Sequence, residues 1–413
     1  MEKNYFGAIE FGNLFTTCLI VSYHHNKLDV VATAIFKTLG YNDNKITNKD
    51  EFKQTIMDIK NKISFKYKID FDEVILVLPN NSHEIYQATA KSKILTERQI
   101  IGESQIDAIR AQIKKTSVGE NRVLIDEFPL SYMLDNGRAL RSAPVNYQSS
   151  TLAIKFNLHT ILKEDIYPVR ECLKECGINV IGQVLNCSCA PYVTCQTFDL
   201  EGECIHVNIL QEVTTISAYK KNALRKSIKI DFGIKNLVEE LATSLNVSLD
   251  EALELFESYF ICDLPASSTI SFDENNNLSE RTISEIVINY LENNISLIIE
   301  SVNKLANECL FTEHYILLTG LLNDYIGFDK FFENKTSLRV KAKNIYAIGF
   351  DGQEYLNDYG AIVQFIDNNA NYVNARLEED DHLIIGNDNT TTNVTNISQT
   401  SSNTKRFHDI FEE

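Results

Sequence analysis

Cysteine is the residue type in this sequence best suited to chemistry, because its nine copies could form disulfides, bind a metal or act as nucleophiles. Cys172 and Cys176 are spaced to share one face of a helix. Cys187, Cys189 and Cys195 have no matching cluster of histidines nearby. Buried free thiols are therefore favoured over a zinc site or a disulfide framework.

The other reactive residue types form no recognisable catalytic arrangement. Serine, histidine and aspartate lack the spacing of a nucleophilic triad, and no carboxylate pair has the pattern of general acid–base catalysis. His159 and His206 fall in strand-like segments and are interpreted as ordinary core or surface histidines. The sequence thus predicts neither catalytic residues nor metal ligands.

The charge balance limits the partners that this chain can bind. Its formal net charge is −18, with 44% hydrophobic and 23% charged residues. Nucleic acid is excluded because phosphate binding needs clustered lysine and arginine, and an anionic membrane would repel the body of the protein. The most apolar runs, 74–78 and 315–318, are far shorter than the roughly 20 residues of a spanning helix. Without a signal sequence at Met1, the chain is expected to start and remain in the cytosol.

Hydrophobic periodicity predicts an α/β fold in which each half begins with a hairpin and ends with helices. Thr96 with Gln99, and Ser248 with Glu251, have the pattern of capping boxes, and Gly177 is expected to end a helix. The predicted strands cover 6–23 with a turn at Gly12, 27–36, 74–78, 122–134, 150–158, 180–185, 204–219 as a hairpin, 223–231 and 315–319. The predicted helices cover 49–65, 96–113, 165–176, 234–245, 248–259, 281–309 and 359–366.

Several motifs occur in the order found in one superfamily of nucleotide-binding proteins. The run Gly7–Leu14 resembles the first phosphate loop of the actin, Hsp70 and sugar-kinase superfamily. Arg122–Asp135 resembles a hairpin of the inserted subdomain peculiar to FtsA, the bacterial actin-like cell-division family. Cys204–Tyr219 occupies the position of the second phosphate hairpin, and Ile316–Gly320 that of the adenosine loop. The chain resembles FtsA over roughly residues 5 to 367.

The resemblance implies a two-lobed actin-like (ribonuclease H-like) α/β fold with an FtsA-type inserted subdomain. It also implies a cytoplasmic protein that polymerises, binds the C-terminal peptide of FtsZ and ties the division ring to the inner membrane surface. The expected divisions are 1–83, 163–200 (first lobe), 84–162 (inserted subdomain), 201–230, 304–367 (second lobe), 231–303 (second-lobe subdomain), 368–404 (polar linker) and 405–413 (terminal motif).

The nucleotide site implied by the resemblance has lost several of its usual residues. Glu10 stands where the family has aspartate, and Phe15 where a lysine is common. In the second loop, 208–215, both threonines remain but the aspartate and every glycine are gone, and Glu212 brings a negative charge. Leu321 and Leu322 follow the adenosine loop where glycines continue in the family, and Leu253 and Phe256 replace the expected glutamate and lysine. The positions that correspond to the site are Glu10, Gly12, Asn13, Thr214, Thr215, Gly233 and Gly320. ATP hydrolysis is not expected, and ATP with Mg²⁺ would bind only if this degenerate site still functions.

The last residues carry a short apolar motif behind a polar linker. Residues 388–404 are almost entirely Asn, Thr, Ser and Gln, which is typical of a flexible segment. Phe407, Ile410 and Phe411 would share one face of a helix, with Lys405 and Arg406 at its start. Such a helix could lie in a membrane interface, as the family's C-terminal helix does; the alternative is a disordered end or a motif for a protein partner. Three partly inserted side chains bind weakly alone, so a filament would be needed for avidity.

The FtsZ-peptide site is implied only by the family, in which the peptide docks on the subdomain formed here by 231–303. Lys235, Asn236 and Arg281 are candidates because they are polar and would edge that surface. Two other functions remain open: an actin-like scaffold of a pilus or secretion assembly, and an ATP-driven chaperone or sugar kinase. The degraded phosphate loops argue against the second of these.

Overall fold

The computed structural model describes residues 4–96, 98–116, 118–195, 197–263, 271–273, 278–345, 349, 352–370, 372–374 and 376. The chain divides into two compact units. Unit 1 comprises Met1–Leu78, Arg170–Gln196 and Lys343–Glu413, and unit 2 comprises Pro79–Val169 and Thr197–Ala342.

Unit 1 is built on a five-stranded sheet in the order β11-β6-β1-β2-β3. β1 pairs antiparallel with β2 and parallel with β6, so a hairpin and a crossover share the central strand. The strands are β1 (Tyr5–Phe11), β2 (Phe15–His24), β3 (Lys27–Lys37), β6 (Glu73–Leu78) and β11 (Asn179–Leu185), with a small ribbon of β4 (Tyr41–Asn42) and β5 (Lys45–Ile46). The helices are α1 (Lys49–Lys62), the π-helical segment η1 (Ile63–Tyr67), α3 (Lys163–Glu175), which begins in unit 2, α4 (Asn186–Thr194), η3 (Gln353–Tyr355) and α10 (Leu356–Asn368).

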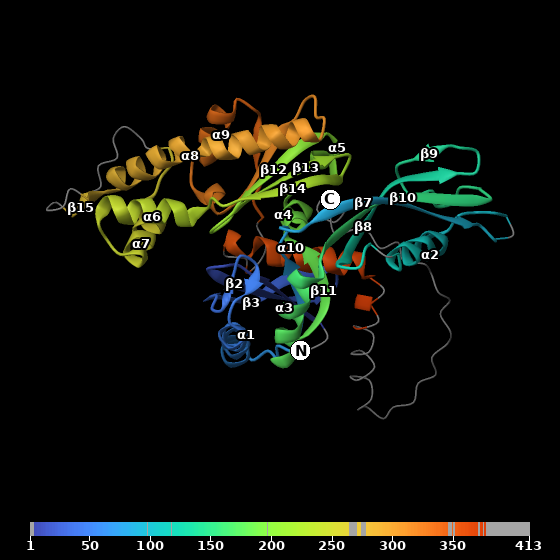
Figure 1. Cartoon of the computed structure of the whole chain (residues 1–413), viewed down its shortest axis with the longest axis horizontal. Coiled ribbons are helices and arrows are strands. Elements are labelled where there is room, and N and C mark those ends of the chain that lie inside the picture. Colours follow the sequence, from blue (N-terminus) through green and yellow to red (C-terminus); the bar gives the residue numbers. More distant parts are fainter. Residues whose placement is uncertain are drawn as a thin grey trace. The chain divides into compact units, whose positions relative to one another are not determined.

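Both faces of the unit 1 sheet are covered because successive side chains of a strand point to opposite faces. Phe6 and Ala8 of β1 pack in the core formed with α10. Phe11 points to the other face, and the centre of its ring lies 4.7 Å from the centre of the Phe52 ring in α1. Figure 1 shows α1 on one side of β2 and β3, with α10 on the other. Fully burying one such aromatic side chain contributes about 1.5–3 kcal/mol, so these contacts fix the position of β1.

Unit 2 contains a second five-stranded sheet, in the order β14-β13-β12-β17-β18. The helices α6, α7 and α8 place their apolar faces in one core with β12, β13 and β17, and Figure 1 shows α8 running along these strands. The strands are β12 (Glu203–Ile209), β13 (Thr214–Lys220), β14 (Ala223–Ile230), β17 (Tyr315–Gly320) and β18 (Val340–Ala342), with the ribbon β15 (Ser271–Asp273) and β16 (Leu278–Ser279). The helices are α5 (Thr197–Glu201), α6 (Ile234–Leu245), α7 (Leu249–Tyr259), α8 (Glu280–Glu308), η2 (Leu321–Asp324) and α9 (Phe328–Thr336).

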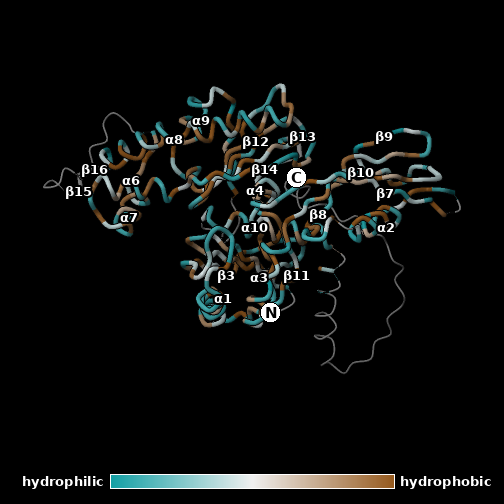
Figure 2. Tube along the Cα trace, in the orientation of Figure 1, coloured by the Kyte–Doolittle hydropathy of each residue, from teal (hydrophilic) through white to brown (hydrophobic). Residues whose placement is uncertain are grey.

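A smaller sheet in the order β7-β10-β8-β9 also belongs to unit 2. Its elements are β7 (Glu84–Lys93), α2 (Glu103–Lys114), β8 (Arg122–Leu134), β9 (Ala139–Leu140) and β10 (Thr151–Leu162). The helix α2 covers one face through Ile106, Ile109 and Ile113 (Figure 1). In Figure 2 the sheet strands of the molecule carry most of the hydrophobic colour, whereas α1 is largely hydrophilic.

Most predicted elements are confirmed, but the predicted helix start at Thr96 is wrong. The helix α2 begins at Glu103, with Gly102 as its N-cap and the Gln105 side chain accepting the Gly102 N–H at 2.8 Å. The preceding residues instead pair with the 146–150 segment; for example, the Ile101 N–H donates to the carbonyl oxygen of Tyr147 at 2.9 Å. Because these backbone groups are used across the sheet, they are not available to a helix.

Most of the cysteines are buried thiols, as the sequence predicts. All nine cysteines are free thiols; seven are buried, and Cys176 and Cys309 are partly exposed.

His159 and His206 are buried in the core, and burial lowers the pKa of each imidazole to about 3. His159 Nδ1 lies 3.0 Å from Nε2 of His83, which stacks on it. Both histidines are core residues, which is one of the two environments that the sequence left open.

Candidate functional site

The carboxylate of Glu10 is held at the end of β1 by two amide side chains. Asn186, the first residue of α4, donates from Nδ2 to Oε1 at 3.2 Å. Asn357, in the first turn of α10, donates from Nδ2 to Oε2 at 2.9 Å. Burial raises the pKa of Glu10, and the two amides offset part of that rise. Each carboxylate oxygen of this predicted site residue therefore already accepts a hydrogen bond from within unit 1.

A second carboxyl group, that of Asp358, lies fully buried in α10 close to Glu10. Neither of its oxygens has a hydrogen bond of good geometry within the described part of the chain, although the nearby Thr17 side chain acts to lower its pKa. Burial raises the pKa of Asp358 well above its ordinary value, and the negative charge of Glu10 raises it further. Burial and the Asp358 charge likewise raise the pKa of the Cys18 thiol. This environment favours the protonated forms of both groups.

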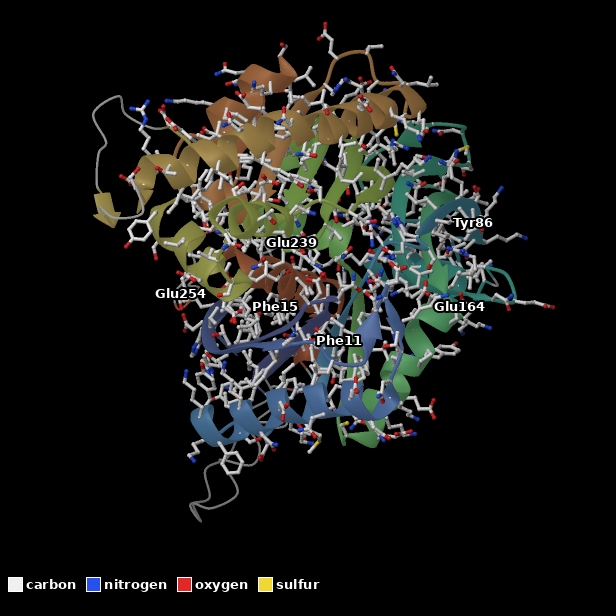
Figure 3. The ribbon with its side chains drawn as sticks, turned by 60° about the vertical axis from the view of Figure 1, so that its left-hand side comes forward. Phe11, Phe15, Tyr86, Glu164, Glu239 and Glu254 are labelled. Atoms are coloured by element: carbon white, nitrogen blue, oxygen red, sulfur yellow. The ribbon has the colours of Figure 1, made fainter. Side chains whose placement is uncertain are left out.

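The turn between β1 and β2 contains Gly12 and Asn13. It is closed by the Gly12 N–H, which donates to the carbonyl oxygen of Phe15 at 3.0 Å. Figure 3 labels Phe11 and Phe15 at the two ends of this turn, both on unit 1. The Asn13 side-chain oxygen is buried and has no hydrogen-bond partner among the described residues. Residues 11–16 contain no lysine or arginine, so this turn itself offers a phosphate only backbone and amide groups.

In unit 2 the turn after β12 is packed against the start of α6. The turn is closed by the Leu210 N–H, which donates to the carbonyl oxygen of Val213 at 2.9 Å. The first N–H groups of α6 then donate into the same turn, that of Ile234 to Leu210 O at 3.1 Å and that of Lys235 to Gln211 O at 2.8 Å. Helix N-termini are natural anion sites because these N–H groups are usually free. Here the first two have backbone partners.

Close backbone packing at this turn explains Gly233. A Cβ atom at this position would lie 2.5 Å from the carbonyl oxygen of Leu210 and 2.6 Å from that of Gln211. The Gly233 N–H donates to Oδ1 of Asn236 at 2.9 Å, so Asn236 caps the helix. A glycine that could have been kept for a ligand is thus required by the fold itself.

The side chain of Glu212 forms an ion pair at the same place. Its Oε1 lies 3.9 Å from Nζ of Lys235, which also lies 3.8 Å from Oε1 of Glu239 one turn further along α6. Figure 3 labels Glu239 on α6. The Glu212 side chain is only 15% exposed, compared with 39% for that of Lys235. The lysine nearest the turn is therefore shared between two carboxylates.

The remaining predicted site residues of unit 2 stabilise its sheet. Thr214 Oγ1 donates to the carbonyl oxygen of Phe232 at 2.8 Å, and Thr215 is 2% exposed. Gly320 has φ 100°, and a Cβ there would lie 2.1 Å from the carbonyl oxygen of Ile209. The hydroxyl of the preceding residue, Thr319, donates to Asn208 Oδ1 at 3.0 Å. These contacts join the ends of β12, β13 and β17.

The structure thus groups the predicted nucleotide positions in two sets, one in each unit: Glu10, Gly12 and Asn13 in unit 1, and Thr214, Thr215, Gly233 and Gly320 in unit 2. The predicted partner residue Arg281 lies on α8, where its Nε donates to Oε1 of Glu285 at 2.7 Å. The predicted membrane residues lie outside the described part of the chain: Phe407, Ile410 and Phe411.

Sequence reasoning missed the side chains that surround Glu10. Asn357 and Asp358 are polar residues in the first turn of a helix that is buried on almost every side. Two adjacent polar residues in so apolar a helix could have indicated a buried polar site, because buried polar groups usually have a specific partner. Asn186 carried no comparable signal. None of the described helices has the length and apolar character needed to cross a membrane.

Comparisons with known proteins place this geometry in a wider context. No family model matches the chain. A cell division protein FtsA of Staphylococcus epidermidis is 23% identical over 262 residues, which are 63% of this chain and 55% of that protein. A cell division protein FtsA of Agrobacterium fabrum is 19% identical over 258 residues, which are 60% and 57% of the two chains. The matching region thus spans about half the length of these curated relatives.

Solved structures match over more of the chain. A structure described as the PilM-PilN type IV pilus biogenesis complex aligns with TM-score 0.58 and 14% identity, covering 87% of this chain and 98% of that one. The fold is actin-like. The ethanolamine utilization protein EutJ of Carboxydothermus hydrogenoformans also aligns, with TM-score 0.50 and 11% identity over 87% of this chain and 89% of its own. The predicted actin-like fold class and the predicted resemblance to FtsA are confirmed.

Proposed function

We propose that this chain is an actin-like cell-division protein that polymerises and tethers FtsZ to the inner face of the cell membrane, with ATP binding lost or weakened. Its location would be peripheral, on the cytoplasmic side of the membrane at the division site. The similarity to two FtsA proteins supports the cellular role. The single observation that carries the loss of ATP binding is the packing of the 210–213 turn against α6.

Phosphate and Mg²⁺ do not fit the residues that correspond to the family's site. A phosphate bound at α6 would need N–H groups that already donate to Leu210 and Gln211, and it would meet the Glu212 carboxylate. Mg²⁺ prefers ionised carboxylates and water, whereas burial raises the pKa of Glu10 and one acceptor site on each of its oxygens is taken by an amide. ATP and Mg²⁺ are therefore not assigned a role, and no catalytic step is derived.

In this proposal the partner site is the subdomain formed by residues 231–303. The C-terminal peptide of FtsZ would dock there, with Arg281 at the edge, since its ion pair with Glu285 leaves both side chains 54% exposed. Lys235 and Asn236 are weaker candidates, because Lys235 pairs with Glu212 and Glu239 while Asn236 caps α6. The membrane contact would come from the terminal motif at Phe407, Ile410 and Phe411, made effective by avidity in a filament.

A second candidate function is favoured by one observation. The structural likeness to the PilM-PilN complex covers 98% of the matched chain, a larger share than the FtsA alignments cover. An actin-like scaffold of a pilus or secretion assembly would share the fold and would equally need no ATP hydrolysis. It would not bind the FtsZ peptide.

Peptide binding separates the two functions. Fluorescence anisotropy with a labelled FtsZ C-terminal peptide should give saturable binding to the full chain. Arg281→Glu should weaken it about ten-fold, whereas the matched exposed control Arg170→Glu should leave it unchanged. If the peptide does not bind even when the protein concentration is raised 100-fold, the FtsZ tether is rejected and the pilus-type scaffold is favoured.

A further inference from the structure

The segment that ends α1 presents a large aromatic side chain to solvent. Here the helix continues as the π-helical turn Ile63–Tyr67, and the side chain of Phe65 is 75% exposed. The turn is held from below by fully buried Ile63, and the chain that follows is fixed by buried Ile69 and Phe71. Short π-helical segments are rare and are often found at functional sites. Phe65 is thus presented outward from a firmly packed base.

The same segment carries an unusual concentration of positive charge. Between positions 60 and 68 the chain has four lysines and no acidic residue, although its net charge is −18. None of the four forms an ion pair within the described part of the chain. Lys62 lies over the Phe36 ring and Lys66 over the Tyr67 ring, at 5.2 and 4.9 Å from the ring centres. We name Lys62, Phe65, Lys66 and Lys68 the lysine–aromatic patch.

Lys60 ties the end of α1 to the start of β11, whereas Lys62 and Tyr67 contact β3, the opposite edge strand of the unit 1 sheet. Lys60 Nζ donates to the carbonyl oxygens of Cys176 and Gly177 at 2.9 and 3.1 Å, directly before β11. At that edge the first residue of β11, Asn179, pairs with Glu73, the first residue of β6. Glu73 in turn accepts a hydrogen bond from Arg376 at 2.7 Å. These contacts link Lys60 to Arg376 through the starts of β11 and β6.

Arg376 ties the chain that follows α10 to the starts of β1 and β6. It is 9% exposed, donates to Glu73 and to the carbonyl oxygen of Tyr5, and lies 5.1 Å from the centre of the Phe6 ring. It is also the last described residue. The turn at Gly12 is at the opposite end of β1.

We propose that the lysine–aromatic patch is a second membrane contact that binds an anionic lipid surface. Phe65 would enter the interfacial layer, and the lysines would lie against lipid phosphates with their aliphatic stems along apolar surface. This proposal rests on the membrane half of the proposed function. Charge complementarity and the exposed Phe65 ring beside the lysines favour lipid over an acidic protein segment. Two weak contacts, the patch and the terminal motif, would together give the pair of signals that stable membrane attachment requires.

A single fluorophore can report this contact, because the chain contains no tryptophan. Full-length Phe65→Trp is mixed with vesicles of 70% phosphatidylcholine and 30% phosphatidylglycerol, with brominated phosphatidylcholine as the quencher. We expect a blue-shifted emission and strong quenching. Leu95→Trp is the matched control, since Leu95 is 89% exposed but lies in unit 2, and its emission should not change.

Charge reversal tests the lysines. Lys66→Glu/Lys68→Glu should lower the vesicle partition coefficient at least ten-fold, because each lysine contributes about five-fold near an anionic surface. The control Lys91→Glu/Lys93→Glu makes the same change in net charge on exposed β7 side chains and should stay within two-fold. Unchanged melting temperatures would show that both variants are folded.

The outcomes separate this inference from the proposed function. If the full chain sediments with vesicles but Phe65→Trp is not quenched, the tail acts alone and the inference is overturned. If quenching occurs but the FtsZ peptide does not bind, the FtsZ tether fails and the patch stands. If the FtsZ peptide binds but the full chain does not sediment, the membrane half and the inference both fail. If an acidic peptide, and not lipid, shifts the Phe65→Trp emission, the patch binds protein and the lipid assignment is wrong.

Discussion

The carboxylate of Glu212 lies 3.9 Å from the ammonium group of Lys235, in the first turn of α6. Lys235 also lies 3.8 Å from the carboxylate of Glu239, so its charge is shared between the 210–213 turn and its own helix. Backbone carbonyls of the same turn accept the first N–H groups of the helix. The features that make a helix start attractive to a phosphate are thus used within the protein.

This relationship predicts that Mg-ATP stabilises the protein very little. A dissociation constant of 10 μM would add about 2.7 kcal/mol to the free energy of unfolding at 1 mM ATP. We expect less than about 0.5 kcal/mol, measured by denaturant unfolding with and without 1 mM Mg-ATP. EDTA provides the control for magnesium dependence. Calorimetry that gave micromolar, magnesium-dependent affinity would contradict the loss of ATP binding.

Gly320→Ala tests whether this glycine is kept for the fold. The backbone φ of 100° and a Cβ 2.1 Å from the Ile209 carbonyl oxygen would both have to be relieved. We expect a loss of about 3 kcal/mol or more in unfolding free energy, from backbone strain and steric overlap together. Gly137→Ala is the matched control, with φ 78° and open space around it, and should cost about 1–2 kcal/mol. Equal costs would mean that close packing at Gly320 is unimportant.

Asp358 should make the stability of the protein fall as the pH rises. Folding raises the pKa of Asp358, so the folded state holds the proton more tightly than the unfolded state does. That contribution is complete below the ordinary value of 3.8 and is lost as the pH rises through the folded pKa. Asp358→Asn should therefore gain stability relative to wild type between pH 5 and pH 8, by at most about 1.4 kcal/mol per pH unit.

Urea unfolding at each pH measures this difference. Asp107→Asn, an exposed aspartate on α2, is the control and should follow the wild-type curve. An Asp358→Asn curve parallel to wild type would mean that burial does not hold the proton on Asp358.

Arg376→Leu should be costly because this ion pair is largely shielded. Arg376 is 8% exposed at its side chain and Glu73 30%, with 2.7 Å between them. Losing the charged hydrogen bond should cost about 1.5–3 kcal/mol of unfolding free energy. The pair of Arg281 and Glu285 has the same separation but is 54% exposed on both sides, so Arg281→Leu should cost less than about 0.5 kcal/mol. A similar cost for both variants would show that shielding from solvent does not strengthen the Arg376–Glu73 pair.

The sequence predicted the elements whose pattern is local. Helix α6 was expected at 234–245 and is found at Ile234–Leu245, because its apolar residues recur at helical spacing. The start of α2 was missed because tertiary pairing, which the local pattern does not contain, uses the backbone around Ile101. Propensity and capping signals are overridden where a strand-like ladder is available to the same groups.

In the candidate site, too, local features could be predicted from the sequence and long-range contacts could not. The loss of glycines near Glu212 could be recognised from the sequence, since it depends on residue types in one turn. The ion pair to Lys235 and the amides that hold Glu10 could not, because they join residues far apart in the chain. The exposure of Phe65 was also missed, since an aromatic residue in a helical pattern is normally assigned to the core.

Co-sedimentation of FtsZ with anionic vesicles tests the tether most directly. FtsZ and vesicles are mixed with either the full-length chain or a chain ending at Ser402, which lacks the motif at Phe407, Ile410 and Phe411. The proposed function predicts that FtsZ reaches the vesicles only with the full-length chain. If neither chain brings FtsZ to the vesicles, the actin-like fold is present without the division role, and a pilus-type scaffold becomes the better account.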